Sequence, residues 1–247
     1  MDYRNRFYTN YLTSHVAFDE KITLESFAIV AKSFQNHIAQ YIPKDTNASI
    51  LDVACGPGHL LHFLQKQGYH NSRGIDLGIE QLNTAVKMGV QNVEQADLFK
   101  FLKTHMEQFD VILAFHIIEH LTKPEALQAV DLIFGALKAE GKVLVATPNT
   151  FSFAGLYATF GDFTHELAFT PKSLAQLLRI CGFSNVNVSG LGPVAYDLRS
   201  AVRTTLWKIL KAFYKVCFTI ERGTGRSIWQ DRPIFEKAIL AVGHKKV

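Results

Sequence analysis

Apolar positions recur with two different periods along the chain. In residues 1–42 they follow helical spacing, as Phe27, Val30 and Phe34 show, and Pro43 interrupts the pattern. From residue 48 onward, short β-branched runs alternate with amphipathic stretches of roughly 10–15 residues. We therefore expect an N-terminal helical segment followed by an α/β domain with a largely parallel, buried sheet.

Seven runs are predicted to form strands and four to form helices. Most of the predicted strands are short and rich in Val, Ile or Leu, which is typical of strands buried on both faces. The strand ranges are 49–54, 73–76, 92–96, 109–115, 142–147, 185–189 and 237–243. The helix ranges are 59–67, 79–88, 124–137 and 171–181.

The composition suits one globular domain of generous size, with 247 residues of which 48% are apolar and 19% charged. No apolar run approaches the roughly 20 residues of a membrane-spanning helix. The first residues are polar and aromatic, unlike a signal peptide. The three cysteines share neither a disulfide nor a metal spacing, which suits a reducing compartment. We therefore expect a cytoplasmic protein.

The most specific motif is a glycine turn after the first predicted strand. The run from Ile50 to His59 passes from an apolar strand through Gly56, Pro57 and Gly58 into a predicted helix. Glycines in such a turn let the backbone bend sharply and approach a ligand closely. The free N–H groups at the start of the helix point to the same place. A ligand site is therefore expected above the end of this strand.

Acidic residues accompany the first three predicted strands. Asp52 lies in the first strand, Asp76 ends the second, and Asp97 follows the third. A carboxylate at the end of the second strand can accept hydrogen bonds from both hydroxyls of a ribose. One after the third strand could accept a hydrogen bond from the exocyclic amine of adenine. The pattern predicts a nucleoside-containing cofactor.

This ordered series resembles the class I S-adenosylmethionine-dependent methyltransferases, through five motifs over roughly 48–190 and the last strand. The resemblance implies a Rossmann-like, seven-stranded, mostly parallel sheet with an antiparallel last strand and helices on both faces. It also implies S-adenosyl-L-methionine as the cofactor, with Asp52 near its methionine end. The cofactor-binding residues that it implies are Asp52, Ala54, Cys55, Gly56, Gly58, Asp76, Leu77, Asp97, Leu98 and Phe115.

A nicotinamide-binding Rossmann domain is the main alternative for the glycine turn. Its fingerprint needs three glycines as G-x-G-x-x-G, but Leu61 stands where the third is required. Glycines that serve only a tight turn are a second alternative. One departure from the methyltransferase pattern is Ala54, where the family often has a glycine. Because alanine is small, cofactor binding is still expected.

The run His116–His120 matches the H-x-x-E-H pattern of inverted zinc peptidases. That chemistry needs both histidines on one face of a helix, whereas this motif directly follows a predicted strand. In the methyltransferase family the same stretch reads as a strand, then Glu-His-Leu, then a helix, which Glu119, His120 and Leu121 fit. We therefore expect no metal site. His116 is expected to line the cofactor pocket, and His120 to be packed and hydrogen-bonded.

His165 lies shortly before the predicted helix that Thr170 caps. In the methyltransferase family, a histidine before a Phe-Thr helix start is frequent near the mouth of the active site. Two interpretations of His165 stay open: it orders its loop, or it positions an acceptor hydroxyl and takes its proton. The candidate catalytic residues are His165 first, followed by His116 and Asp162.

An insert of residues 191–233 separates the two parts of the predicted cofactor-binding domain, 48–190 and 234–247, and residues 1–47 form the N-terminal segment. From residue 199 to residue 222 the insert carries six basic residues and one acidic residue, so it accounts for the net charge of +4 of the whole chain. One apolar helical stripe runs along it, widened by three aromatic residues. The stripe comprises Leu206, Ile209, Leu210, Phe213, Val216, Cys217 and Ile220, and the aromatic residues are Trp207, Tyr214 and Phe218.

Three interpretations of this basic amphipathic insert are open. It packs on the domain with a solvated basic face, it meets an anionic membrane or a lipid-linked acceptor through residues 199–222, or it contacts a second copy. Nucleic acid is disfavoured because the aromatic residues lie on the apolar stripe. The insert is similar to those of methyltransferases of bacterial cell-surface glycan and lipid biosynthesis, and of the quinone-modifying branch.

These features predict a cytoplasmic S-adenosylmethionine-dependent methyltransferase, peripheral at the inner face of the membrane if the insert meets lipid. The expected reaction is in-line methyl transfer to an oxygen of a small molecule, a glycan or a lipid-linked acceptor. A quinone-type C- or O-methyltransferase is an alternative. An inactive scaffold that binds the cofactor without turnover is another.

Overall fold

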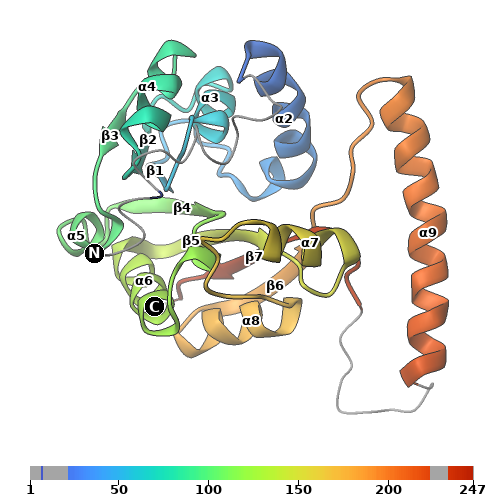
Figure 1. Ribbon diagram of the computed structural model, residues 1–247. Helices are drawn as coiled ribbons and strands as arrows, with labels where there is room; N and C mark the ends of the chain where they lie inside the picture. The colour runs from blue at the N-terminus through green and yellow to red at the C-terminus, as the bar shows by residue number, and fades with distance from the viewer. Residues whose placement is uncertain (1–6, 8–21, 223–232, 247) are drawn as a thin grey trace.

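A seven-stranded sheet forms the centre of the computed structural model, which describes residues 7, 22–222 and 233–246 (Figure 1). The strand order is β3-β2-β1-β4-β5-β7-β6. Only β7 runs antiparallel to its neighbours, so the predicted topology is confirmed. The strands are β1 (Ile50–Val53), β2 (Ser72–Asp76), β3 (Val93–Gln95), β4 (Phe109–Phe115), β5 (Leu137–Pro148), β6 (Ser184–Gly190) and β7 (Ala238–His244).

Helices cover both faces of this sheet, as expected (Figure 1). Successive strand residues point to opposite faces, so Ile50 and Leu51 of β1 belong to different core clusters. Ile133 and Leu178 pack in the cluster with Leu51, and Leu64 packs in the cluster with Ile50. The helices are α2 (Leu24–His37), α3 (His59–Lys66), α4 (Ile79–Lys87), α5 (Leu98–Lys103), α6 (Lys123–Ala136), α7 (Phe153–Gly161), α8 (Pro171–Ile180) and α9 (Leu198–Arg222), with 3-10 turns η2 (Ala39–Tyr41) and η3 (Ile118–His120).

The N-terminal helical segment is described from residue 22 onward, and the prediction for residues 1–6 and 8–21 lies outside the described residues. A capping box starts α2: the Thr23 hydroxyl accepts from the Ser26 N–H, and the Ser26 hydroxyl accepts from the Thr23 N–H. The buried ring of Phe27 stacks on His59, with ring centroids 4.1 Å apart. The segment is therefore packed against α3, the helix that follows the glycine turn.

Two helices and one strand boundary differ from the predicted ranges. Sequence reasoning left α5 and α7 unassigned, although side chains cap both: Asp97 accepts from the Lys100 N–H, and Ser152 accepts from the Gly155 N–H. Both helices are short, and α7 lacks a polar face, so their periodicity is weak. The strand β5 begins at Leu137, earlier than the predicted 142, because this residue pairs with the start of β4 across a register shift.

The insert forms one continuous helix of 25 residues, α9, which stands beside the domain (Figure 1). It contacts the domain through Tyr214, whose ring centroid lies 5.8 Å from that of Phe235, and through Lys211 Nζ, 2.6 Å from Glu236 Oε1. The aromatic side of α9 thus faces the domain, while the aliphatic stripe is exposed. The exposed members of the stripe are Leu206, Ile209, Leu210, Phe213, Val216 and Ile220.

Residues 223–232, the end of the predicted insert, lie outside the described residues. In the part of the chain that the structure describes, no helix combines the length and apolarity needed to cross a bilayer.

Replacement of Gly155 by alanine tests how tightly α7 is fixed against the sheet. A Cβ there would collide with the carbonyl oxygens of Asn149 and Lys237. Gly155→Ala is therefore expected to lower the free energy of unfolding by roughly 1–3 kcal/mol, as overpacking does. Gly161→Ala, on the same helix with nothing within 4 Å of its added Cβ, is the control and should be neutral or slightly stabilising. Denaturant unfolding measures both, and equal stability of the two variants would contradict this packing.

Candidate functional site

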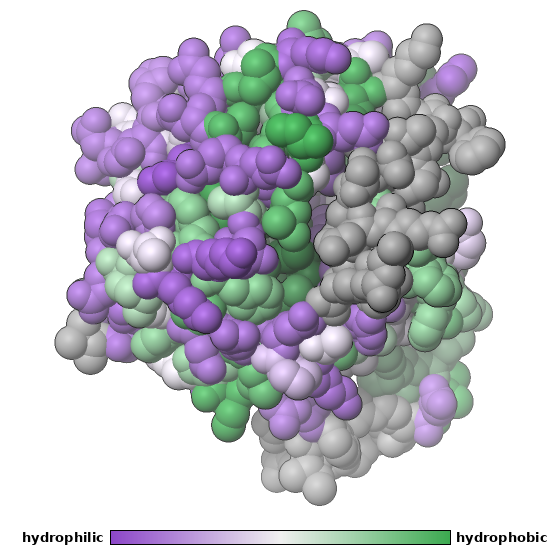
Figure 2. Space-filling model, turned by 60° about the vertical axis from the view of Figure 1, so that its left-hand side comes forward, coloured by the Kyte–Doolittle hydropathy of each residue, from purple (hydrophilic) through white to green (hydrophobic). Residues whose placement is uncertain are grey.

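The carboxyl ends of β1, β2 and β4 open into a cavity of about 2020 Å³. Typical ligand pockets measure roughly 300–1,000 Å³, so this one has room for a cofactor and a second molecule. The domain face in Figure 2 is mainly hydrophilic around a central hollow with apolar side chains. Most of the predicted site residues line the cavity, namely Asp52, Ala54, Cys55, Gly56, Asp76, Leu77, Asp97, Leu98, Phe115, His116 and His165.

The glycine turn has the left-handed backbone that its sequence predicts. The φ angles are 54° at Gly56 and 83° at Gly58, and Ala54 adopts 59° where the family often has a glycine. A Cβ on Gly56 would lie 2.9 Å from Gln81 Oε1, so the turn leaves little room for a side chain. Gly58 does not line the cavity. An added Cβ there would press on Val90, which gives Gly58 a packing role.

Asp76 ties together the two loops that border the predicted ribose position. One carboxylate oxygen accepts from the Gly56 N–H at 2.8 Å, and the other accepts from the Gly78 N–H at 2.7 Å. Burial raises the pKa of Asp76, although these backbone hydrogen bonds oppose the shift. Each oxygen keeps a second lone pair, so the carboxylate can still accept from a ligand hydroxyl.

Asp52 is buried beside Asp76 without a compensating partner. Its residue is 2% exposed, and no described residue donates a hydrogen bond to its carboxylate. Burial raises the pKa of Asp52 well above the ordinary range, and the nearby charge of Asp76 raises it further. A cationic ligand in this cavity would relieve the cost of ionising Asp52.

The other predicted cofactor residues have mixed environments. Asp97 caps α5 through its Oδ1, so one oxygen is already engaged and the carboxylate serves the fold as well as the cavity. Cys55 is buried, and burial raises the pKa of its thiol. Leu77 is exposed at the cavity edge, while Leu98 and Phe115 are partly buried in its wall. These apolar side chains could hold a flat ring by contact.

His116 and Glu119 form a pair at the end of β4. His116 Nδ1 lies 3.0 Å from Glu119 Oε1, and the exposed fractions of their side chains are 56% and 1%. Desolvation by the surrounding cavity wall lowers the pKa of His116, but the hydrogen bond and charge of Glu119 outweigh it, so the pKa is raised overall. Burial likewise raises the pKa of Glu119, and His116 reverses this to a lowered value. An ionised Glu119 therefore orients the His116 ring.

The backbone of His116 explains why its side chain enters the cavity. Its φ of 54° is in the left-handed region, which residues other than glycine rarely adopt. Such a conformation costs of order 1–3 kcal/mol and persists where the surroundings enforce it. Here the His116 N–H donates to Ala146 O on β5 at 2.9 Å, and the turn η3 follows at once.

The H-x-x-E-H run does not form the helix that zinc-peptidase chemistry needs; it follows β4 directly, as predicted from the sequence. His116 follows a strand, and Glu119 and His120 lie in η3. His120 is buried and bonded through Nδ1 to Thr164 Oγ1 at 2.9 Å, which confirms the prediction of a packed histidine. Its burial lowers its pKa, although Glu119 opposes this.

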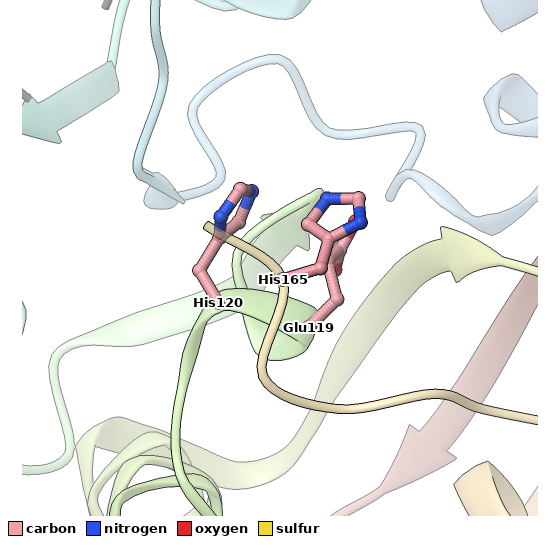
Figure 3. Close-up of side chains that lie close together, drawn as sticks. All are labelled: Glu119, His120 and His165. Atoms are coloured by element: carbon pink, nitrogen blue, oxygen red, sulfur yellow. The ribbon is translucent and has the colours of Figure 1, made fainter. Parts of the chain in front are cut away.

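His165 lies in the loop before α8, against the same turn. Its Nδ1 donates to Thr159 O at 2.8 Å, and its Nε2 lies 3.9 Å from Asp162 Oδ2. Its ring meets the His120 ring edge to face, with centroids 4.6 Å apart. Figure 3 shows the His165 ring beside Glu119 and opposite His120. The side chain is only 9% exposed, so His116 is the more accessible of the two catalytic candidates.

Sequence reasoning missed two components of the site. It gave Glu119 no chemical role, although this carboxylate joins His116 to the turn that carries His120. It also missed the aromatic wall of the cavity, built by α7, α9 and the segment before β7. The aromatic lining residues there are Phe153, Tyr157, Trp207, Tyr214 and Phe235. The sequence did contain a signal for this wall, because the aromatic residues of α9 lie on a different side of the helix from the apolar stripe.

Comparison with known proteins gives the class of the chain. A family described as "Methyltransferase domain" matches residues 28–188. The fold is similar to the structure of a SAM-dependent methyltransferase from Archaeoglobus fulgidus, with a TM-score of 0.64, 20% identity, and coverage of 89% of this chain and 94% of that one. The chain therefore belongs to the methyltransferase-domain family, and the expectation of a methyltransferase with a Rossmann-like fold is confirmed.

Curated relatives with a named activity are also similar to this chain. The chain is 30% identical over 164 residues to the ubiquinone biosynthesis O-methyltransferase of Psychrobacter arcticus, covering 58% of this chain and 61% of the relative. It is 30% identical over 172 residues to the enzyme of the same name from Xylella fastidiosa, covering 63% and 68%. The chain thus spans about three fifths to two thirds of the length of these relatives.

The residues of the cavity fit S-adenosylmethionine. This cofactor carries a sulfonium and an ammonium, which suit the buried and otherwise uncompensated carboxylate of Asp52. Its ribose diol suits Asp76, and the narrow turn at Gly56 suits close approach of a ligand to the backbone. When bound, the cofactor supplies an activated methyl group.

Asp52→Asn is expected to make the cofactor-free protein more stable and its cofactor binding weaker. In the folded wild type the raised pKa of Asp52 keeps its proton to higher pH than in the unfolded chain. Wild-type stability is therefore lost as pH rises from the ordinary carboxyl pKa through the folded pKa. Asparagine does not titrate, so the advantage of the variant should grow over that window and persist at pH 7.

Thermal unfolding from pH 4 to pH 8 without cofactor measures the first effect of Asp52→Asn. Titration calorimetry with S-adenosylmethionine measures the second, expected to be roughly a 10- to 100-fold loss of affinity, as for a charge-assisted hydrogen bond. Asp110→Asn is the matched control, because Asp110 opens β4 at the opposite end and pairs with Lys138. A variant less stable than wild type at pH 7, or one with unchanged affinity, would contradict the assignment of Asp52.

Proposed function

We propose that this protein transfers a methyl group from S-adenosylmethionine to a hydroxyl oxygen on an aromatic ring that carries a long apolar tail. The observation that carries the proposal is the shape and lining of the cavity. The lining includes the carboxylates Asp52 and Asp76 and the aromatic residues of α7 and α9. It also includes His116, which we take as the accessible base.

The named relatives support this acceptor class. A ubiquinone biosynthesis O-methyltransferase, by its name, acts on oxygen in the synthesis of ubiquinone. Ubiquinone itself is a substituted ring with a long apolar tail. The apolar end of the cavity is suited to such a tail, since rings such as Trp207 and Tyr214 bury apolar area efficiently.

The proposed catalytic step needs alignment and one proton acceptor. The acceptor oxygen forms a bond to the methyl carbon as the bond from that carbon to sulfur breaks, and the electron pair remains on sulfur. The hydroxyl proton passes to His116 Nε2, because Nδ1 donates its own proton to Glu119. Glu119 fixes the tautomer and stabilises the imidazolium. In this proposal the base is His116 and not His165.

His116→Asn is expected to lower kcat by about 10²- to 10⁴-fold, the usual contribution of a general base. Affinity for S-adenosylmethionine should change little, since the carboxylates that face the cofactor are intact. Transfer of radiolabelled methyl groups to hydroxylated rings with short isoprenoid tails measures kcat. The exposed His70 supplies the control variant His70→Asn. Full activity of His116→Asn would remove His116 from the mechanism, and no transfer by wild type to any tailed ring would contradict the acceptor class.

The outer side of α9 supports a further part of the proposal, that the protein docks on an anionic membrane surface to reach its acceptor. Ile209, Phe213 and Ile220 on this side are 64%, 61% and 77% exposed, and no described residue covers them. Most of the basic residues of 199–222 lie on another side of the same helix. An amphipathic helix with exposed apolar residues and a basic face is the usual interfacial element of peripheral proteins. The neighbouring, aromatic side of α9 lines the cavity, so docking would bring the cavity close to lipid-borne acceptors.

Ile209→Glu is expected to weaken vesicle binding roughly tenfold or more, because it removes buried apolar area and adds a charge that anionic lipids repel. Co-sedimentation with vesicles of phosphatidylcholine and phosphatidylserine measures binding, and vesicles of phosphatidylcholine alone should bind less. Ile180→Glu, at an isoleucine that is 75% exposed on α8, controls for loss of a surface isoleucine elsewhere. Binding that ignores phosphatidylserine, or equal losses in both variants, would exclude this role of α9.

A further inference from the structure

Three potential metal ligands converge next to the proposed base. Glu119, His120 and His165 each offer one ligand atom, and these atoms all lie within 4.8 Å of one another. Two of the residues come from η3 and the third from the loop before α8, which the chain separates by more than 40 residues (Figure 3). All three line the large cavity.

The second oxygen of Glu119 gives an independent reason to expect a cation. Oε1 accepts from His116, but Oε2 is buried and no described residue donates a hydrogen bond to it. The side chain is 1% exposed, so water does not compensate it freely. A buried carboxylate oxygen without a donor costs several kcal/mol unless a positive charge approaches it.

The hydrogen bonds of the two histidines set both rings in the tautomer that metals require. Thr164 Oγ1 donates to Asp162 Oδ1 at 2.7 Å, so it must accept from His120 Nδ1. Thr159 O can only accept, so His165 Nδ1 carries the hydrogen. In each neutral ring the lone pair is therefore on Nε2. Metal-binding histidines are oriented by such bonds from their other nitrogen to carbonyl or carboxylate-linked groups.

We propose that Glu119 Oε2, His120 Nε2 and His165 Nε2 bind one divalent metal ion of the zinc type. Two imidazole nitrogens and one carboxylate oxygen are the donor set of catalytic zinc sites, which keep a position open for water or substrate. In a tetrahedral site, ligand atoms about 2.0–2.1 Å from zinc lie about 3.3 Å apart, so ligand atoms within 4.8 Å of one another would have to approach by up to about 1.5 Å. This proposal differs from the expectation of no metal site drawn from the sequence, and it uses His165 instead of His116 as the partner of His120.

The open position would face the acceptor end of the cavity beside His116. If the proposed O-methylation is right, the metal ion would hold the acceptor hydroxyl oxygen and favour loss of its proton to His116. This part rests on the proposed function. The metal site itself does not, because its ligands and the orphaned oxygen are independent of which acceptor binds.

Metal content and binding of the full-length protein test the site directly. Protein stripped with a chelator should bind about one Zn²⁺ per chain, measured by competition with a fluorescent zinc chelator. Co²⁺ in its place should give visible absorption bands typical of nitrogen and oxygen ligands. His165→Ala should weaken Zn²⁺ binding more than about 100-fold and abolish the Co²⁺ spectrum. Thr164→Val, which removes the hydroxyl that orients His120 and also its bond to Asp162, should weaken Zn²⁺ binding about 10- to 100-fold.

Two controls separate the possible outcomes of this experiment. His70→Ala removes an exposed histidine outside the cluster and should leave Zn²⁺ affinity unchanged. S-adenosylmethionine binding by each variant shows that it is folded, and Glu119→Gln provides a second ligand variant if His165→Ala is not. Absence of a stoichiometric ion, or the same Zn²⁺ affinity in wild type, His165→Ala and Glu119→Gln, would overturn the metal site. Methyl transfer that persists in excess chelator would overturn only the role of the metal in the reaction.

Discussion

The pair of hydrogen bonds that Asp76 accepts is the constraint on which the site depends. The Gly56 N–H belongs to the loop after β1 and the Gly78 N–H to the loop after β2, and one buried carboxylate holds both. This arrangement fixes the left-handed turn at Gly56 and, through it, the start of α3. It also leaves Asp52 close to a second buried negative charge. The cavity is thus built to receive positive charge before any ligand enters.

Glu119 plays a similar organising role at the acceptor side. Its Oε1 orients His116, and its carboxylate lies within 4.8 Å of ligand atoms of His120 and His165. A single buried carboxylate therefore connects the proposed base with the proposed metal site. The strained backbone of His116 belongs to the same arrangement, because the left-handed turn sends the chain directly from β4 into η3. The two carboxylates, Asp76 and Glu119, each organise one half of the cavity.

Sequence reasoning predicted the parts of the site that depend on neighbouring residues. The seven strands, the glycine turn and Asp76 are encoded by local periodicity and short motifs, and the structure has them in the predicted places. Gly58 shows the limit of a motif, because it packs on Val90 outside the cavity. The cluster of Glu119 with His165 depends on the folding of the loop before α8, which no local pattern reveals. The sequence also could not show which side of α9 packs on the domain, because that depends on the tertiary contacts of the helix.

The contact between Lys211 and Glu236 has a mechanical consequence. Glu236 is buried, and its backbone carbonyl accepts from Asn149 Nδ2 at 2.8 Å, at the end of β5 beside the cavity. The Asn149 side chain also accepts from the Phe151 N–H, just before α7. A displacement of α9 would therefore act on Glu236 and, through Asn149, on the end of β5 and the start of α7. The position of α9 is thus coupled to the cavity wall, and moving this helix away would loosen the aromatic wall that it helps to form.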